Sequence, residues 1–439
     1  MRATTDPEIR NAYSADVSGL VMLPEAVARP QTADEVREIL RETAATGTTV
    51  TAAGSQTSTT GASITDTGLL LSMRGLDRLV DVDVERQLAV VEPGVLLGDL
   101  NRAVAQHGLH FAPDPTSMDD VTVGGAIACN ASGARSLLYG PTRPHVQALD
   151  VGLASGDVIS VRRSGLDKNT AGYAFSQEPV DWFVGSEGTL GIILRAEVSL
   201  VPLPARVFGL AIPCPDEATA LALVIAVRES ALRPRCIEYF DPVSLDLALQ
   251  RQGALVYVED ANETPLEAWL ALAERRGMSD DIEVFEGDNA LREARRFRHA
   301  VPTTMNERGA QRRAYGGRKV STDWAVPYRR LPEAIAHARR LVDDAGLPQP
   351  AIYGHAGNGH PHQNFIAADA QELERIEQVV EATLRYVLSI GGTVSAEHGI
   401  GKIKRRWLPL QATPTQLAVM KAVKRELDPA WRLAPGNIL

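Results

Sequence analysis

Three of the nine histidines lie in one short glycine-rich stretch, Tyr353–Asn364 (YGHAGNGHPHQN). Glycine allows sharp turns and close approach of a ligand, so we expect the imidazoles of His355 and His362 to converge on one point. The later segment SAEHGIGK adds the carboxylate of Glu397 and the imidazole of His398. Two histidines and one carboxylate are a ligand set that suits a divalent metal with open coordination positions.

The same histidines have a simpler interpretation. Histidines in glycine-rich loops often serve only as turn residues that hydrogen-bond their own backbone. The spacing H-x6-H is also no standard zinc signature. The metal interpretation therefore depends on the rest of the chain.

Composition narrows the class of protein. A chain of 439 residues predicts two or three domains, and a net charge of −10 argues against a general nucleic-acid binder. The three widely spaced cysteines form no C-x2-C pair, which argues against a disulfide framework and a four-cysteine iron–sulfur cluster and fits a reducing compartment. Because no apolar run suits a membrane span and the first residues lack the apolar core of a signal peptide, we expect a cytoplasmic protein.

The N-terminal part contains a loop suited to phosphate. A capping box at Thr32–Glu35 predicts a helix to about residue 45, and residues 47–53 predict a strand. The strand leads into Gly54–Ala62 (GSQTSTTGA), whose backbone N–H groups and hydroxyls suit a diphosphate without any lysine. A flexible surface loop has the same composition, so both interpretations stay open.

Two further segments combine small residues with glycine. In Val123–Gly133 (VGGAIACNASG), small side chains would let a planar ligand lie on the backbone, although a tightly packed helix uses them for the same steric reason. Gly185–Ile193 (GSEGTLGII) predicts a glycine-rich turn that leads into a strand. Since no G-x-G-x-x-G opens a helix after the first strand, a classical Rossmann site is not supported.

The pattern changes after Pro202–Pro204. Longer amphipathic helices then alternate with single strands, which predicts an α+β insert with an antiparallel sheet. We expect helices over 216–232, 265–276, 331–345 and 370–390, and strands over 236–240 and 254–258. The expected domains are residues 1–204, an insert over 205–390 and a C-terminal segment over 391–439 that docks back on the first domain.

These motifs, in this order, resemble the FAD-dependent D-2-hydroxy-acid dehydrogenases of the vanillyl-alcohol-oxidase superfamily. This group includes glycolate oxidase, D-lactate dehydrogenase and D-2-hydroxyglutarate dehydrogenase types. The resemblance implies an α+β fold with a two-subdomain FAD-binding domain (PCMH type) and an α+β cap domain. It also implies non-covalent FAD, since the first loop holds no histidine.

The resemblance also assigns residues. The metal ligands, for Zn or Mn, carry over to His355, His362 and Glu397, and the catalytic base to His398. Arg298 is our candidate for the substrate carboxylate, with a solvated helix arginine as the alternative. The expected FAD contacts are Gly54, Ser55, Gln56, Thr57, Ser58, Gly61, Ala62, Pro115, Gly124, Gly125, Ala128, Asn130, Ser132, Gly133, Tyr139, Glu187, Gly188, Gly191 and Ile193.

The implied chemistry fits these residue types. Oxidation of a 2-hydroxy acid moves a hydride from Cα to the flavin and a proton from the hydroxyl to a base. A cation on the hydroxyl makes it more acidic, and a histidine suits the proton transfer. Asn358 and His360 stand where the family usually has Asp and Asn, so His360 is an extra ligand, a supporting residue or a surface residue. The C-terminal APGN departs from the usual NPGK.

Other functions remain open at this point. A non-catalytic FAD subunit that relays electrons in a larger complex is one alternative, and an enzyme like alkyldihydroxyacetonephosphate synthase is another. For the dehydrogenase we expect a quinone, a cytochrome or a partner subunit as electron acceptor. Such a protein would be a homodimer or a subunit of a complex, in the cytoplasm or at the membrane surface through its partner.

Overall fold

The computed structural model describes residues 3–261, 264–278 and 281–439 and divides the chain into two compact units. Unit 1 comprises Met1–Ser132, Gly140–Leu203 and Glu397–Leu439. Unit 2 comprises Gly133–Tyr139 and Pro204–Ala396.

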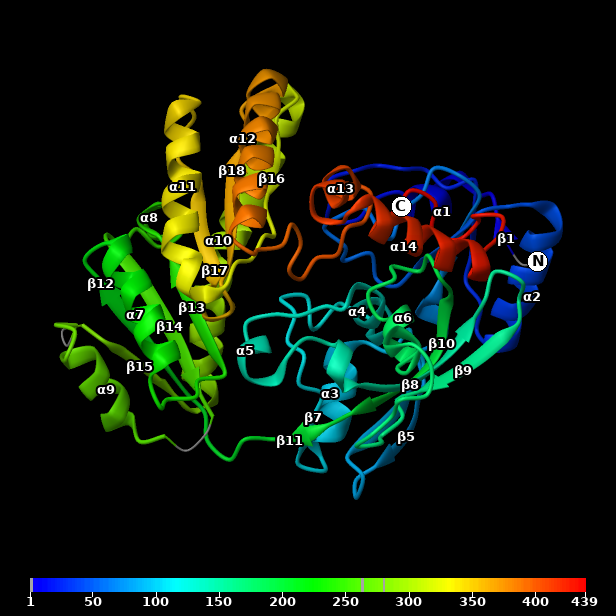
Figure 1. Cartoon of the computed structure of the whole chain (residues 1–439), viewed down its shortest axis with the longest axis horizontal. Coiled ribbons are helices and arrows are strands. Elements are labelled where there is room, and N and C mark those ends of the chain that lie inside the picture. The colour runs from blue at the N-terminus through cyan, green and yellow to red at the C-terminus, as the bar shows by residue number, and fades with distance from the viewer. Residues whose placement is uncertain (1–2, 262–263, 279–280) are drawn as a thin grey trace. The chain divides into compact units, whose positions relative to one another are not determined.

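Unit 1 contains two main sheets, drawn mostly in blue to teal in Figure 1. In the four-stranded sheet, β2 and β3 run parallel to β4. The five-stranded sheet is antiparallel and has the order β5-β6-β10-β8-β9. The strands are β1 Ala3–Thr4, β2 Ala26–Ala28, β3 Val50–Ala53, β4 Leu69–Ser72, β5 Leu79–Asp83, β6 Leu88–Val91, β7 Leu109–His110, β8 Val146–Gly152, β9 Val158–Arg162, β10 Ile192–Ser199 and β11 Val201–Pro202.

The helices of unit 1 follow their sequence signals. The side chain of Thr32 caps α2 by accepting from Glu35 N, as predicted. Glu35 itself accepts from the N–H of Gln31 at 2.7 Å, one residue earlier than a standard capping box requires. Residues 123–129 of the small-residue segment form helix α4, in which Val123, Gly124, Ala126 and Ile127 are buried. The helices are α1 Pro7–Ala12, α2 Ala33–Thr46, α3 Leu97–Ala105, α4 Val123–Cys129, α6 Val180–Phe183, α13 Leu408–Gln411 and α14 Pro414–Leu427.

Unit 2 is built on one seven-stranded sheet of order β15-β12-β14-β13-β17-β18-β16. Every neighbouring pair is antiparallel, as the sequence predicts. The strands are β12 Phe208–Cys214, β13 Cys236–Phe240, β14 Ala254–Asp260, β15 Glu283–Glu286, β16 Lys319–Ser321, β17 Ala351–His355 and β18 His360–Ile366.

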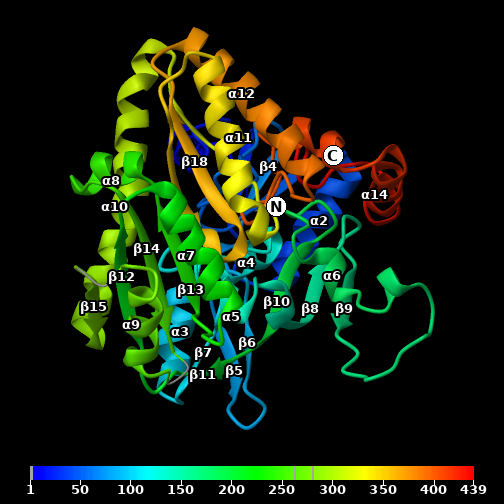
Figure 2. The same ribbon diagram turned by 60° about the vertical axis from the view of Figure 1, so that its left-hand side comes forward.

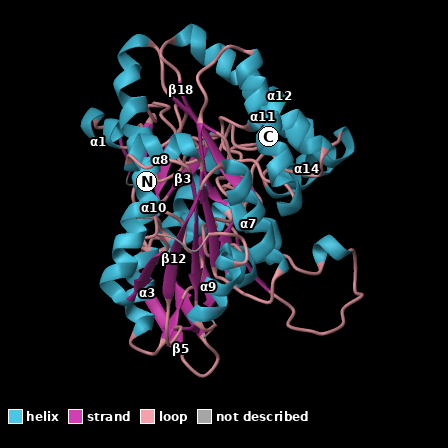
Figure 3. Ribbon diagram, turned by 90° about the vertical axis from the view of Figure 1, so that its left-hand side faces the viewer, coloured by secondary structure: helices cyan, strands magenta, loops and turns pink. Residues whose placement is uncertain are grey.

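Helices pack on this sheet, and α10 runs alongside its strands in Figures 2 and 3. One hydrophobic core joins α8 and α10 to alternate residues of β13, β14 and β17, among them Phe240, Tyr257 and Tyr353. Side chains alternate between faces along a strand, so this core marks the sheet face that α8 and α10 cover. The helices are α5 Ser136–Tyr139, α7 Glu217–Glu229, α8 Pro242–Leu249, α9 Leu266–Glu274, α10 Gly287–Arg312, α11 Leu331–Asp344 and α12 Ala370–Ser389.

Candidate active site

The clustered histidines lie on a β-hairpin, whose two strands were not predicted from the sequence. Strand β17 ends at His355, a short 3-10 turn covers Ala356–Asn358, and β18 begins at His360. In the register, His355 pairs with His360 and Tyr353 pairs with His362. Because side chains alternate along a strand, all three imidazoles share the face of Tyr353, which α8 and α10 cover.

The three imidazoles are close neighbours. The ring centroids lie 5.4 Å apart for His355 and His360, 5.2 Å for His355 and His362, and 4.6 Å for His360 and His362. One nitrogen of each ring lies within 4.8 Å of the others. His360 is only 4 % exposed, so it is no surface residue and belongs to the cluster.

Two carboxylates fix the orientation of these rings. Glu238 Oε1 lies 2.7 Å from His355 Nδ1, and Asp323 Oδ1 lies 2.9 Å from His360 Nε2. Each leaves the other ring nitrogen turned away from the carboxylate. Neither residue was predicted from the sequence, although a glutamate within the apolar strand CIEYF was a usable signal.

This donor set fits a divalent transition metal. Imidazole nitrogen is a preferred ligand of Zn²⁺, whereas Mn²⁺ prefers oxygen ligands such as the carboxylate of a glutamate. A ligating histidine commonly donates its second nitrogen to a carboxylate, which sets the tautomer and increases the basicity of the ligand atom. His355 with Glu238 has this arrangement.

Arg298 lies over the same face of the sheet. It belongs to α10, its side chain is buried, and its Nη2 lies 3.9 Å from Glu238 Oε2. Glu238 therefore contacts both Arg298 and His355 through different oxygens. The alternative of a solvated helix arginine is wrong, because Arg298 is 9 % exposed. Among the residues that the structure describes, its buried Nε has no hydrogen-bond partner.

Glu259 holds a group of arginines beside this face. It accepts from Arg235 Nε at 2.7 Å, from Arg298 Nη1 at 3.3 Å and from Arg135 Nε at 3.3 Å. Burial would raise the pKa of Glu259, but the three guanidinium groups outweigh burial and hold this pKa well below its usual range. Glu259 is thus an anion at any pH near neutrality.

Glu397 and His398 begin the C-terminal part of unit 1. Within that unit, His398 Nε2 lies 3.2 Å from Glu397 Oε1, and Ser132 Oγ lies 3.4 Å from Glu397 Oε2. The residue before them, Ala396, belongs to unit 2 and donates its N–H to Asp323 O at 2.8 Å. Glu397 directly follows Ala396 in the chain, so the segment that carries Glu397 and His398 begins one residue after the residue that bonds Asp323.

The predicted phosphate loop follows β3 directly. A Cβ at Gly54 would lie 2.3 Å from Thr122 Oγ1, so only glycine allows this contact with the residue that caps α4. Ser58 Oγ accepts from the N–H groups of Thr60 and Ala62, which closes the second half of the loop.

Arg74 adds a positive charge to this loop that our sequence analysis did not predict. Its Nη1 donates to Ser55 Oγ at 2.7 Å. Its Nε is buried and has no hydrogen-bond partner among the residues that the structure describes. A loop of hydroxyls, with no acidic residue and one guanidinium, fits a bound diphosphate.

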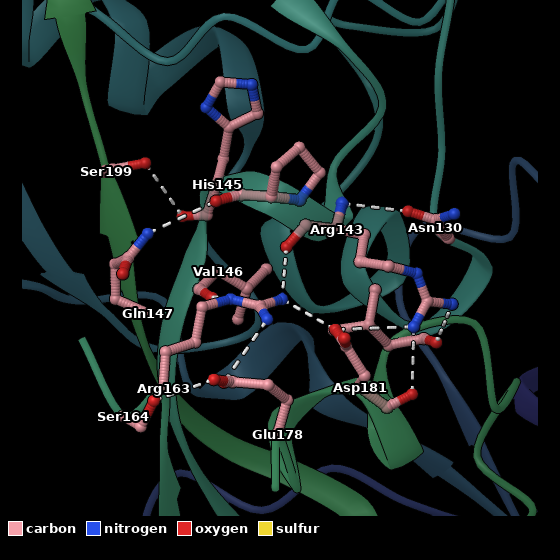
Figure 4. Close-up of polar contacts among 12 residues, drawn as sticks. Asn130, Arg143, His145, Val146, Gln147, Arg163, Ser164, Glu178, Asp181 and Ser199 are labelled. Atoms are coloured by element: carbon pink, nitrogen blue, oxygen red, sulfur yellow. Dashed lines mark hydrogen bonds and ion pairs between the residues drawn. The ribbon is translucent and has the colours of Figure 1, made fainter. Parts of the chain in front are cut away.

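The other predicted FAD contacts are distributed around α4. Asn130 ends α4 in a left-handed conformation and accepts from Arg143 N, as Figure 4 shows. Glu187 N donates to Ala128 O, which brings the second glycine-rich turn to α4. A Cβ at Gly191 would lie 2.4 Å from Val151 Cγ1, so packing requires glycine at this position of the turn. Most of the predicted FAD contacts belong to unit 1, whereas Gly133 and Tyr139 belong to unit 2. Those in unit 1 are residues 54–58, 61, 62, 115, 124, 125, 128, 130, 132, 187, 188, 191 and 193.

Two known protein families together match most of the chain. The family described as "FAD linked oxidases, C-terminal domain" matches residues 203–438, and the one described as "FAD binding domain" matches residues 24–162. In the part of the chain that the structure describes, no helix is both long enough and apolar enough to cross a membrane.

Named relatives cover the chain from end to end. It is 31 % identical to "Glycolate oxidase subunit GlcD" of Bacillus subtilis, over 98 % of this chain and 92 % of that protein. It is 29 % identical to a D-lactate dehydrogenase of Archaeoglobus fulgidus, over 98 % of this chain and 96 % of that protein. A D-2-hydroxyglutarate dehydrogenase of Xanthomonas citri is 27 % identical, over 100 % of this chain and 94 % of that protein.

A solved structure shares the fold. Alkyldihydroxyacetonephosphate synthase superposes with a TM-score of 0.74 at 16 % identity, over 99 % of this chain and 82 % of that one. The predicted α+β architecture with a flavin-binding domain is confirmed. With the family matches and the relatives, it follows that this chain belongs to the FAD-linked oxidase family and is an FAD-linked oxidoreductase.

Proposed function

We propose that this protein oxidises a small D-2-hydroxy acid, of the lactate, glycolate or 2-hydroxyglutarate class, to the 2-oxo acid. The observation that carries the proposal is the histidine cluster on the sheet of unit 2, linked through Glu238 to Arg298. A cation-binding group beside a guanidinium suits a substrate with a hydroxyl next to a carboxylate. The names of the relatives support this substrate class.

Each side chain has a defined task in this proposal. His355 and His362 would hold a divalent metal together with Glu397, and the contact of Glu238 with Nδ1 of His355 would set the tautomer of that ring for metal binding. His360, oriented by Asp323, belongs to the same set. When bound, the metal supplies Lewis acidity to the substrate hydroxyl.

Binding and proton transfer fall to two other residues. Arg298 binds the substrate carboxylate, because its guanidinium is buried beside the cluster and its Nε is available. His398 accepts the hydroxyl proton, and Glu397 at 3.2 Å from its Nε2 stabilises the imidazolium that results. FAD, when bound, supplies the acceptor for the hydride from Cα. Turnover requires an external electron acceptor, such as a quinone, a cytochrome or a partner subunit.

The test is anaerobic absorbance of the FAD-loaded protein during addition of D- and L-2-hydroxy acids, before and after treatment with a chelator. We expect one or more D-acids to bleach the flavin bands, the chelator to abolish bleaching, and Zn²⁺ or Mn²⁺ to restore it. Flavin that no acid bleaches would refute the proposed function. Bleaching that survives complete metal removal would refute the metal assignment alone.

A variant of the carboxylate that supports the metal site sharpens this test. Glu238→Ala removes the partner of His355 Nδ1, and loss of such a supporting group lowers metal affinity by roughly 10–100-fold. The matched control is His337→Ala, since His337 lies on α11 and stacks on Tyr386. We expect metal titration of the chelated protein to need correspondingly more metal in the first variant and an unchanged amount in the control.

A further inference from the structure

Glu187 has an unusual position in unit 1. It belongs to the turn between α6 and β10, and its backbone is left-handed, with φ of 50°, which is uncommon for a residue other than glycine. Its side chain is buried, and Glu187 is 6 % exposed. Burying a carboxylate in a disfavoured backbone conformation costs free energy, so its presence calls for a reason beyond packing.

Hydrogen bonds on both sides fix this turn. Gly185 N donates to Ile127 O at 3.0 Å, and Glu187 N donates to Ala128 O at 2.8 Å. Figure 4 shows the guanidinium of Arg143, which donates to Asp181 O at 3.0 Å and to Val184 O at 2.9 Å. The backbone that carries Glu187 is therefore held rigidly against α4, and its carboxylate has a defined direction.

That carboxylate accepts from two consecutive backbone N–H groups of the segment that carries His398. Ile400 N lies 2.6 Å from Oε1, and Gly401 N lies 2.7 Å from Oε2. Between them and His398 stands Gly399, with φ of 75°, where a Cβ would lie 2.5 Å from Glu187 Oε1. The glycine lets the chain approach the carboxylate closely enough for both bonds.

The phosphate loop holds the other side of the same segment. Thr60 O accepts from Lys402 N at 2.9 Å and from Ile403 N at 3.1 Å, and Thr60 Oγ1 donates to His398 O at 3.4 Å. Residues 398–403 thus lie between Glu187 and Thr60, two points that are far apart in the sequence. Burial raises the pKa of Glu187 to about 7, while the two N–H donors and the charges of Lys404 and Lys402 act in the opposite direction.

We propose that Glu187 is a positioning residue for the reaction: its carboxylate holds the 398–401 segment so that the His398 imidazole is directed at the substrate hydroxyl. The inference rests on the proposed function, in which His398 is the base. It also assigns Glu187 to the histidine segment rather than to FAD, the contact we expected from sequence. Loss of the carboxylate should then slow proton transfer while the FAD and substrate sites stay intact.

The test uses Glu187→Gln in the FAD-loaded protein. An amide has one oxygen for two N–H donors, so one of the two bonds is lost at nearly constant volume. Glu92→Gln is the matched control, because Glu92 is also 6 % exposed and lies in unit 1, where it pairs with Arg78. Three quantities are measured at pH 8: hydrogen exchange of the peptide over residues 397–404, the rate of anaerobic flavin reduction, and FAD content.

For Glu187→Gln we expect at least tenfold faster exchange at residues 400–401, at least tenfold slower flavin reduction, less than twofold change in KM, and unchanged FAD content. The control should match the wild type in all of these. If a hydroxy acid reduces the flavin of the wild type and the Glu187→Gln variant is reduced at the same rate, the inference about Glu187 is overturned and the proposed function stands. Loss of FAD in parallel with activity would also overturn it, by assigning Glu187 to the cofactor. A wild-type flavin that no acid reduces would refute the proposed function, and the catalytic role of Glu187 with it.

Discussion

Replacement of Glu259 by Gln should destabilise the sheet of unit 2 far more than loss of one ion pair at the surface. Its carboxylate is 3 % exposed and faces the guanidinium groups of Arg235 and Arg298, each 8 % exposed, and of Arg135, which is 26 % exposed. Without the Glu259 carboxylate, the three guanidinium cations lie close together in a largely buried region with no negative charge between them. Removing one partner of a buried ion pair costs about 3–5 kcal/mol, and Gln still accepts one hydrogen bond, so we expect about 3 kcal/mol.

The assay is native-state hydrogen exchange of the β13 and β14 amides, which reports the opening free energy of this sheet separately from unit 1. The matched control is Glu217→Gln, which is 24 % exposed and whose partner Arg339 keeps Asp241 as a second carboxylate. We expect less than about 1 kcal/mol for this control. Equal losses in both variants would refute the reasoning that buried like charges dominate.

A double variant and a change of pH test the same physical cause. Adding Arg235→Met to Glu259→Gln removes one of the unpaired cations and should restore a large part of the lost free energy. Since the pKa of Glu259 is lowered in the fold, its stabilising contribution is fully present above the unfolded pKa of about 4.5 and is lost progressively as the pH falls from there through the much lower folded pKa. The stability difference between wild type and Glu259→Gln should therefore shrink steadily as the pH is lowered below 4.5, and a difference that stays constant over that range would contradict the electrostatic explanation.

Two further predictions concern unit 1. Arg74→Ala should weaken FAD binding by about 10–100-fold, because a charge-assisted hydrogen bond is worth about 1.5–3 kcal/mol. Fluorescence titration of the apoprotein measures this affinity, and Arg41→Ala at an exposed position of α2 is the control variant. Equal affinities of the Arg74→Ala variant and the wild type would contradict a role for Arg74 at the phosphate loop. Because burial raises the pKa of Glu187 from 4.5 to about 7, the folded state binds more protons than the unfolded state between these values. The free energy of unfolding of the wild type should therefore fall by about 3 kcal/mol relative to that of Glu187→Gln as the pH rises from 4.5 to 8. Parallel curves of unfolding free energy against pH, measured by chemical denaturation, would refute this.

Local signals in the sequence predicted many elements of the fold. The strands Cys236–Phe240 and Ala254–Asp260 and the helices α2, α11 and α12 were predicted to within a few residues, since each has a clear period and clear ends. Helix α10 was not predicted, because the sequence has Pro302 in its interior and charged residues on either side of its apolar positions. The two strands of the histidine hairpin were not predicted, because the glycines between and within them are typical of a turn.

The candidate site was predictable only where its residues are neighbours in sequence. His355 and His362 were identified from one stretch, whereas Glu238 is 117 residues from His355 and meets it only through strand pairing. Asp323 and Arg74 were missed for the same reason, since no local pattern links them to the segments they contact. Long-range pairing in the sheet, rather than any motif, determines these contacts.

The return of the C-terminal segment to unit 1 imposes an order on folding during synthesis. Val50 exchanges backbone hydrogen bonds with Arg432 and Ala434, and Asn437 Nδ2 donates to Ala62 O beside the phosphate loop. The ribosome completes all of unit 2 before these partners emerge, so the nascent first domain must wait with an unfinished sheet edge and an incomplete loop. Such edges favour aggregation. We therefore expect FAD capture to be among the last events of biogenesis, after synthesis of the C-terminal segment that completes the sheet edge and the loop.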